Sequence, residues 1–435
     1  MNETKVFRDP IYGYVKIRDE LIWKLVQTKE FQRLRRIHQL GGTSMVFHTA
    51  EHSRFSHSLG VYEIARRIVY EVESVSNTLT DEERLITLCA ALLHDLGHGP
   101  YSHTFESVFA TNHEQFTIAI ITGDTEVHAV LESYQPGFSN KVARTINGEC
   151  YQGECHDAAC HHHIMGHIIS SQLDADRLDY LQRDAYNTGA TYGEVDQDRI
   201  LRSMVVVDNQ LAFKYSSMHA IENYLVSRYH MYWQVYYHPV SVSHEILLSK
   251  IFHRVMDLMD QGYPFPHDLT AIRMLKEGAI DLETYLELDE VWVNYHIKEW
   301  TKASDPILSD LSERFINRRL YKYLSCRSEN ELQEAYEIFS QVYQKYGIDP
   351  NYYLQQDTIS KEAYQFYNEH VLHHSPILLY YDQRLVEIAE LSHIVRGIKD
   401  VGAKTDYKLY YAKEWIETME ITDKERLQDL IERYQ

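Results

Sequence analysis

Apolar side chains recur at intervals of three and four residues over most of this chain, a pattern typical of amphipathic α-helices. The predicted helices cover residues 21–26, 31–40, 58–75, 81–95, 164–186 and 217–259. Pro239 interrupts the last of them, shorter helices continue to about residue 345, and the chain ends on the helical pattern ERLQDLIERYQ. The sequence therefore predicts a mainly α fold.

Several segments alternate or cluster strand-favouring residues instead. VFRDPIYGYVKI near the start and MVVVDNQLAFK at 204–214 predict hairpins, because β-branched and aromatic residues flank turn-forming ones. ILLYY, RLVEIA and YKLYYAKEW follow late in the chain. We expect a helical core with an N-terminal β-hairpin at 1–240, a helical extension at 241–345, and a smaller α+β part at 346–435.

Composition narrows the class of protein. No stretch approaches the roughly 18 apolar residues that span a bilayer, and MNETKVFRDP has no signal-peptide pattern, so we expect a cytoplasmic protein without membrane contact. The formal charge of −21 disfavours extended nucleic-acid binding, because it repels polyanions. Phosphates would need a local basic pocket.

His94 and Asp95 form the strongest chemical signal, because they are adjacent at the end of an apolar helix. His57 lies upstream and Asp176 downstream, which gives four ligands of the imidazole and carboxylate types. Three of them have a plain alternative: His57 could be a hydrogen-bonded core histidine, Asp95 could cap the helix end or pair with Arg54, and Asp176 could be a solvated acid. Together they favour a divalent metal, and manganese, iron, magnesium and zinc all remain open.

Longer motifs carry a closer resemblance. FQRLRRIHQLGG, EHSRFSHSLGVYEIARR, LLHDLGHGPYSHTFE, NHEQ and LDADRLDYLQRDAY, in this order between about Lys5 and Val240, resemble the deoxynucleoside triphosphate triphosphohydrolases of the HD superfamily. The resemblance implies an HD-domain fold and metal-dependent hydrolysis of a deoxynucleoside triphosphate (dNTP) to deoxynucleoside and triphosphate. The four ligands above would hold the metal.

The same resemblance assigns the groups around the metal. His103 and Glu106 would form a general-acid pair, while His98 and His113 would hydrogen-bond the α-phosphate or the attacking water. The residues implied to bind substrate are Arg54, Arg177 and Arg228 for the phosphates and Gln39, Leu40, Tyr180, Asp184 and Tyr236 for the deoxyribose. Structural ion pairs and aromatic packing are the alternatives for the arginines and Tyr236.

Family members are often oligomers that a nucleotide activates at subunit interfaces. The matching positions of such a regulatory site are Lys5, Gln32, Arg35 and Arg199. We therefore expect a homo-oligomer, a tetramer by resemblance, with dGTP or another nucleotide as a candidate activator. Gln27 and Arg8 depart from the family member that carries a SAM domain, so strict guanine selectivity is not expected. Arg177 stands where that member has a lysine in the substrate site, which preserves the charge but changes the geometry offered to the γ-phosphate.

Two alternatives stay open. The segment ECYQGECHDAACHHHIMGH, which contains Cys150, Cys155, His156, Cys160 and His161 to His163, could hold a second, structural zinc or form a solvated loop. Another HD-type nucleotidase or phosphodiesterase, or a regulatory or nucleic-acid-binding protein with a vestigial site, is an alternative function. The intact ligand set disfavours the vestigial site, and the arginines favour a triphosphate substrate.

Overall fold

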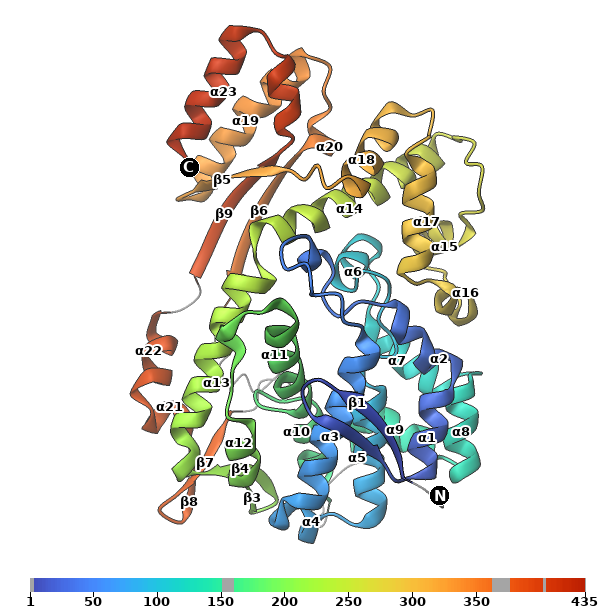
Figure 1. Ribbon diagram of the computed structural model, residues 1–435, viewed down its shortest axis with the longest axis vertical. Helices are drawn as coiled ribbons and strands as arrows, with labels where there is room; N and C mark the ends of the chain where they lie inside the picture. Colours follow the sequence, from blue (N-terminus) through green and yellow to red (C-terminus); the bar gives the residue numbers. More distant parts are fainter. Residues whose placement is uncertain (1–3, 151–159, 362–375, 402–403, 435) are drawn as a thin grey trace.

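Helices make up most of the structure, a computed structural model that describes residues 4–150, 160–361, 376–401 and 404–434 (Figure 1). The helices of the first half are α1 (Glu20–Gln27), α2 (Lys29–Arg33), α3 (Arg54–Glu71), α4 (Glu73–Thr78), α5 (Asp81–Leu93), α6 (His103–Phe109), α7 (His113–Thr122), α8 (Glu126–Tyr134), α9 (Phe138–Ile146), α10 (His162–Ile169), α11 (Ala175–Thr188), α12 (Gln197–Ser203) and α13 (Met218–Met231). None of the described helices is long and apolar enough to cross a membrane.

The later helices alternate with strands towards the C-terminus. They are α14 (Pro239–Asp260), α15 (Thr270–Lys276), α16 (Leu282–Glu287), α17 (Glu290–Trp300), α18 (Pro306–Ile316), α19 (Glu329–Lys345), α20 (Pro350–Tyr353), α21 (Ile388–Leu391), α22 (His393–Val401) and α23 (Ile421–Arg433). A π-helical turn at Tyr232–Tyr236 joins α13 to α14, where Pro239 occupies the first turn of the new helix.

Within the described residues, three small sheets accompany the helices. β1 (Lys5–Asp9) and β2 (Gly13–Ile17) form the predicted antiparallel hairpin. A four-stranded sheet has the order β3 (Met204–Val207), β4 (Gln210–Lys214), β7 (Leu378–Tyr381) and β8 (Arg384–Glu387), with β4 and β7 parallel. The third sheet has the order β5 (Lys322–Cys326), β9 (Lys404–Tyr411) and β6 (Leu354–Lys361).

Two apolar cores hold these elements together. The first lies among α1, α3, α5, α7 to α11 and α13, and it also takes side chains from β7 and α21. The second joins α6 and α14 to α19 with the sheet of β5, β6 and β9. In Figure 1, α14 runs from the first group of helices towards that upper sheet. Because Phe105 joins the second core and Ile377 the first, the cores interleave along the chain, and the division at residues 240 and 345 stays a prediction.

Local sequence determines where α5, the helix that leads into His94 and Asp95, begins and ends. Thr80 and Glu83 form the predicted capping box: Glu83 N–H donates to Thr80 Oγ1 over 3.2 Å, and Thr80 N–H donates to Glu83 Oε2 over 2.8 Å. α5 ends at Leu93, and the loop after it packs against α7. A Cβ on Gly97 would lie 2.0 Å from the His113 carbonyl oxygen, so only glycine allows this approach.

Some predicted boundaries are wrong. The helix expected over 164–186 is broken at residues 170–174, because the Asp174 side chain accepts a hydrogen bond from the Arg177 N–H and caps a new helix. The helix expected over 31–40 ends in a 3-10 turn at Leu34–Arg36, and Ile37 is extended. Strands β5 and β6 were not anticipated, since their residues do not alternate in polarity over their full length.

Candidate metal centre and substrate site

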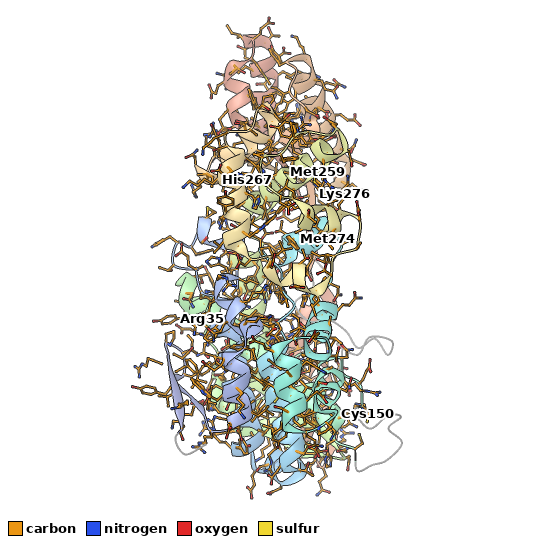
Figure 2. All side chains as sticks on the ribbon, turned by 90° about the vertical axis from the view of Figure 1, so that its right-hand side faces the viewer. Arg35, Cys150, Met259, His267, Met274 and Lys276 are labelled. Carbon is orange, nitrogen blue, oxygen red and sulfur yellow. The ribbon has the colours of Figure 1, made fainter. Side chains whose placement is uncertain are left out.

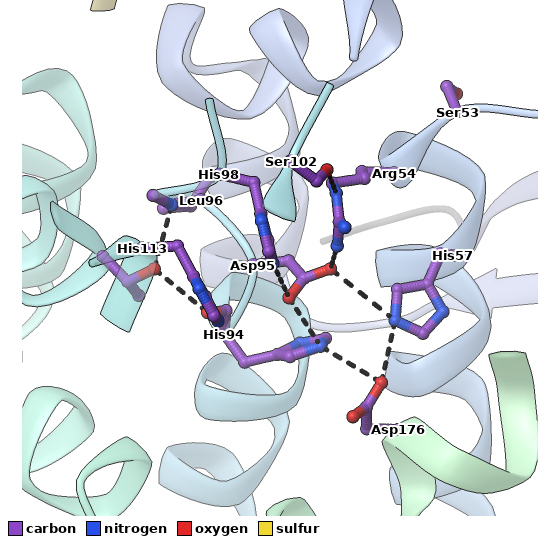
Figure 3. A network of polar contacts seen from close by, with 12 residues as sticks. Ser53, Arg54, His57, His94, Asp95, Leu96, His98, Ser102, His113 and Asp176 are labelled. Carbon is purple, nitrogen blue, oxygen red and sulfur yellow. Dashed lines mark hydrogen bonds and ion pairs between the residues drawn. The ribbon is translucent and has the colours of Figure 1, made fainter. Parts of the chain in front are cut away.

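The four predicted metal ligands come together from three elements. His57 lies in the first turn of α3, His94 and Asp95 follow the last turn of α5, and Asp176 lies in the first turn of α11 (Figure 3). Side chains at the ends of these helices face one another, so His57 and Asp176 share one site although they are 119 positions apart in the chain. Asp176 is the most exposed of them, with 29% of its side chain accessible.

The separations between the donor atoms suit one cation. His57 Nε2 lies 3.0 Å from Asp176 Oδ1 and 3.7 Å from Asp95 Oδ2, while His94 Nε2 lies 3.6 Å from Asp176 Oδ1 and 3.3 Å from Asp95 Oδ1. Ligands bound at about 2.1 Å in octahedral or tetrahedral geometry are roughly 3.0–3.5 Å apart. One donor atom each from His57, His94 and Asp176 lies within 4.8 Å of the other two, and Asp95 faces them through different oxygens, Oδ1 towards His94 and Oδ2 towards His57. The residues present therefore fit a divalent metal.

Hydrogen bonds on the far side of each imidazole direct the other ring nitrogen to the centre. His94 Nδ1 lies 2.9 Å from the Ala91 carbonyl oxygen, to which it can only donate, so Nε2 carries the lone pair. This buried Nε2 has no hydrogen-bond partner among the described residues. His57 Nδ1 lies 2.8 Å from Asp179 Oδ2 in the same way. Such partners orient metal-binding histidines in proteins.

The electrostatics of the site favour positive charge beside its two carboxylates. Burial alone would raise the pKa of Asp95 and Asp176, but His94 with Arg54 holds the first, and His57 with His94 the second, below the ordinary value. Burial would lower the pKa of His57, yet hydrogen bonds to Asp176 and Asp179 raise it to about 10. Two ionised carboxylates thus face the imidazoles, an arrangement that a bound cation satisfies.

Arg54 closes one side of this centre. Its NH1 donates to Asp95 Oδ2 over 2.5 Å and its Nε donates to Ser102 Oγ over 3.0 Å, and only 4% of the residue is exposed (Figure 3). The alternative that Asp95 pairs with Arg54 is therefore present in the structure, together with the metal-ligand geometry. Phosphate binding by Arg54 stays a prediction.

A second cluster contains all four predicted acid and base residues. Glu106 Oε2 lies 3.1 Å from His103 Nδ1, and Glu106 Oε1 lies 2.7 Å from His113 Nδ1 and accepts from the His113 backbone N–H over 2.6 Å. The His98 ring stacks on that of His113 with centroids 3.9 Å apart. His103 is the outermost member, since 80% of its side chain is exposed.

Charge differs sharply within this cluster. Burial, with Arg54 nearby, holds the pKa of His98 well below its ordinary value, so this ring is neutral near pH 7. Burial would raise the pKa of Glu106, but hydrogen bonds to His103 and His113 lower it. His98 Nε2 lies 3.4 Å from Asp95 Oδ1, which links the cluster to the metal centre.

Two predicted phosphate-binding arginines lie beside each other on α11 and α13. Arg228 is 6% exposed and its NH1 lies 3.3 Å from Gln172 Oε1, while Arg177 NH1 pairs with Asp174. The Nε of each is buried without a hydrogen-bond partner in the described structure. Burial would raise the pKa of Tyr232, but Arg228 lowers it. Positive charge is therefore concentrated here inside an acidic protein.

The predicted deoxyribose residues meet at Asp184. Tyr236 donates its hydroxyl to Asp184 Oδ2 over 2.8 Å, and the Tyr236 and Tyr180 rings pack edge to face at 6.2 Å. The Gln39 backbone N–H donates to the His52 carbonyl oxygen over 2.9 Å. The Nε2 atom of His52 lies 2.7 Å from Asp184 Oδ1, so Gln39 lies in the same region. Leu40 is half-buried in the loop that follows.

The predicted regulatory residues are only partly brought together. Arg35 Nε donates to Gln32 Oε1 over 2.9 Å, and its guanidinium lies 3.5 Å from the centre of the Phe55 ring. Lys5 lies in β1, whereas Arg199 lies in α12 and donates to the Ser216 carbonyl. Figure 2 shows Arg35 on the flank of the lower half that is opposite Cys150.

The Cys/His-rich segment is described only at its ends. Cys155 and His156 lie outside the described residues. Cys150 Sγ and His162 Nδ1 each lie 3.2 Å from Cys160 Sγ. Both the zinc site and the solvated loop therefore remain predictions.

The sequence did not reveal the residues that hydrogen-bond the predicted metal and sugar ligands from outside the site. Asp179 and Arg183, both buried in α11, and His52 beside Asp184 were not singled out. Asp179 and Arg183 are four residues apart, a spacing that places an acid and a base on one helix face. That signal was present in LDADRLDYLQRDAY, but the string contains several such pairs.

A helical fold with one His/Asp metal centre is the architecture of an HD-domain hydrolase, and comparisons with known proteins agree. Residues 54–184 match the HD domain and residues 195–263 match the HD associated region. Uncharacterized protein YwfO of Bacillus subtilis is 48% identical over 418 residues, which cover 96% of this chain and 94% of that protein. The chain belongs to the HD-domain family of phosphohydrolases, in the group similar to deoxynucleoside triphosphate triphosphohydrolases.

More distant similarities extend this result. The Dictyostelium discoideum protein named deoxynucleoside triphosphate triphosphohydrolase SAMHD1 homolog is 31% identical over 258 residues, 57% of this chain and 49% of that protein. The crystal structure of a phosphohydrolase from Bacteroides thetaiotaomicron has a TM-score of 0.79 and 28% identity, and covers 94% of this chain and 100% of its own. A hypothetical protein from Aquifex aeolicus has a TM-score of 0.74 and 30% identity, with 98% and 100% covered.

Proposed function

We propose that this protein hydrolyses dNTPs to deoxynucleoside and inorganic triphosphate with a divalent metal. The observation that carries the proposal is the placement of four side chains of α11: Asp176 lies at the predicted metal centre, Arg177 lies near Arg228, and Tyr180 and Asp184 lie beside Tyr236. One helix would thus present groups for the metal, the phosphates and the deoxyribose in sequence. The relatives named as dNTP triphosphohydrolases support the same substrate class.

Different residues have different roles in the proposed reaction. His57, His94, Asp95 and Asp176 would hold a divalent metal, which would supply positive charge beside the phosphates and ease the deprotonation of the attacking water. In the reaction, the water oxygen bonds to the α-phosphorus and the bond from that phosphorus to the 5′ oxygen breaks. The attacking water gives up one proton as its oxygen bonds to phosphorus, and the departing 5′ oxygen takes one, so the sum is the addition of water across the broken bond.

His103 is the group that we assign as the proton donor. Its Nδ1 faces Glu106, which leaves Nε2 to hold a proton towards the substrate from an exposed position. His98 and His113 stack next to it, and His98 in its neutral form has one nitrogen available to hydrogen-bond a phosphate oxygen or the attacking water.

Arg54, Arg177 and Arg228 would neutralise the phosphates, since guanidinium groups bind phosphate oxygens in pairs. Another HD-type nucleotidase or phosphodiesterase is the second candidate, because the metal centre alone serves either reaction. The neighbouring cations Arg177 on α11 and Arg228 on α13 favour a triphosphate, since a monoester would not need so many positive charges.

Regulation and assembly are part of the same proposal. Gln32 and Arg35, joined by a hydrogen bond, would bind an activating nucleotide such as dGTP with Lys5 and Arg199, in a homo-oligomer that we expect to be a tetramer. A cytoplasmic location remains an expectation. The native metal is one of manganese, iron, magnesium or zinc.

The test is to incubate the purified protein with Mn²⁺ and each dNTP, alone and with dGTP or dATP, and to separate products by ion-exchange chromatography. We expect deoxynucleoside and intact triphosphate, abolished in His94→Ala and Asp95→Ala. Asp198→Ala, whose side chain is 69% exposed, is the control and should keep full activity. Monophosphate with pyrophosphate, or no turnover of any dNTP, would overturn the proposal.

A further inference from the structure

The N-terminal hairpin reaches the metal centre through one hydroxyl group. Tyr12, in the turn between β1 and β2, donates its hydroxyl to Asp179 Oδ1 over 2.7 Å, although 167 residues separate them. The other oxygen of Asp179 lies 2.8 Å from Nδ1 of His57, a ligand of the predicted metal. A single carboxylate therefore joins the hairpin turn to the back of a metal-binding imidazole.

This carboxylate is held rigidly from a third side. Arg183 donates from Nε to Asp179 Oδ2 over 2.8 Å and from NH2 to Oδ1 over 3.0 Å. Asp179 is 0% exposed, and His57 and Arg183 are each 1% exposed, so water does not compete with these bonds. With Arg183 and Tyr12 in place, Oδ2 is directed at the His57 ring.

The same arginine fixes the hairpin turn that carries Tyr12. Arg183 NH1 donates to Asp9 Oδ2 over 3.0 Å, and Asp9 Oδ1 accepts the backbone N–H groups of Ile11 and Tyr12 over 2.8 and 3.1 Å. The turn is thereby closed around Asp9, an arrangement typical of an aspartate that begins a turn. Tyr12 cannot leave Asp179 without disturbing this closed network.

Backbone geometry makes room for the link. A Cβ on Gly60 of α3 would lie 1.9 Å from Asp179 Oδ1 and 2.4 Å from Arg183 NH2. Glycine at this position therefore allows α11 to bring its carboxylate against α3, one turn after His57. Burial and Asp179 raise the pKa of Tyr12 well above its ordinary value, so the hydroxyl keeps the proton that it donates.

We propose that Tyr12 is a positioning residue of the metal centre: through Asp179 it orients His57 and raises the affinity of the site for its metal. The N-terminal hairpin then belongs to the metal centre as well as to the predicted regulatory region. Partners behind a metal-binding histidine typically change metal affinity by about 10- to 100-fold. This proposal rests on the metal site of the proposed function and is independent of the substrate.

The experiment compares Tyr12→Phe with Tyr14→Phe in the full chain. Tyr14 lies on the same hairpin and is 52% exposed, and its ring lies 4.7 Å from the Arg8 guanidinium. Removing its hydroxyl is therefore the matched control. Mn²⁺ affinity is measured by equilibrium competition with a fluorescent chelator, without nucleotide. We expect about a 10-fold or greater loss for Tyr12→Phe and less than a twofold change for Tyr14→Phe.

Equal Mn²⁺ affinity in wild type and a folded Tyr12→Phe would overturn the link while leaving the metal site intact. If the wild type itself bound no Mn²⁺, the proposed metal site would fail instead. Circular dichroism and thermal unfolding establish folding. Should Tyr12→Phe not fold, Asp179→Asn takes its place; if neither folds, the network serves the fold alone, which also overturns the proposal.

Discussion

Glu106 holds His113 through one carboxylate oxygen, which accepts from the His113 backbone N–H at 2.6 Å and lies 2.7 Å from Nδ1 of its ring. The second oxygen lies 3.1 Å from His103 Nδ1. Glu106→Gln replaces one of these acceptors by an amide and should misorient one histidine. We expect kcat to fall about 100-fold, while the bound metal, measured by plasma emission spectrometry, stays at the wild-type content.

Glu114→Gln is the control for this variant, because Glu114 is an exposed acid on the same helix as His113. It should keep wild-type kcat. An equal loss in both variants, or wild-type kcat in Glu106→Gln, would contradict the assignment of His103 and Glu106 as the acid pair.

Tyr236 should decide between deoxyribose and ribose. Its hydroxyl is held by Asp184, so the ring is fixed beside the predicted sugar position. Tyr236→Ala should admit a 2′ hydroxyl and lower the ratio of kcat/KM for dATP over ATP by about tenfold or more. Tyr186→Ala, an exposed tyrosine of α11, should leave the ratio unchanged. An unchanged ratio in Tyr236→Ala would remove Tyr236 from sugar recognition.

Arg228 offers a test of the phosphate clamp. Arg228→Ala should raise KM for dNTPs and the inhibition constant of inorganic triphosphate by about 10- to 100-fold, since a charge-assisted hydrogen bond contributes roughly 1.5–3 kcal/mol. Arg202→Ala, an exposed arginine on α12, is the control. If triphosphate inhibits Arg228→Ala as strongly as the wild type, the arginine is structural.

Glu245 on α14 predicts a pH dependence of stability. Burial, with Asp357 nearby, raises the pKa of Glu245 to about 7. The folded state therefore binds more protons than the unfolded state between about pH 4.5 and 7, and this contribution to stability is lost as pH rises through that window. The loss amounts to about 3 kcal/mol above pH 7.

Glu245→Gln removes the titrating group, so its Tm should fall less between pH 5 and 8 than that of the wild type. Scanning calorimetry at both pH values provides the comparison, and Glu334→Gln, an exposed acid of α19, is the control. Parallel falls in Tm for wild type and Glu245→Gln would contradict a raised pKa at this position.

The sequence predicted those parts of the fold whose signal is local. The Thr80–Glu83 cap, the first hairpin and the end of α5 follow from residues that are neighbours in the chain. The break at residues 170–174 escaped prediction because the apolar periodicity continues across it, and only the side chain of Asp174 ends the pattern. The parallel pairing of Phe213 with Leu379 was equally hidden, since long-range pairing leaves no local pattern.

In the site, too, local signals could be predicted and long-range contacts could not. The metal ligands could be predicted because His94 and Asp95 are adjacent and their companions lie in long motifs. Tyr12 could not, because its role depends on a hydroxyl that meets Asp179 from across the structure. Arg54 has two interpretations in the sequence, as ion pair or phosphate ligand, and its bond to Asp95 shows that the ion pair exists.

Hydrolysis in ¹⁸O-labelled water tests the central claim most directly. Attack of water on the α-phosphorus with loss of the 5′ oxygen places the label in inorganic triphosphate and leaves the deoxynucleoside unlabelled. We predict one ¹⁸O per triphosphate, detected by ³¹P NMR and mass spectrometry, with none in the deoxynucleoside. Label in the deoxynucleoside, or in a monophosphate or pyrophosphate, would contradict the account of this protein as a dNTP triphosphohydrolase.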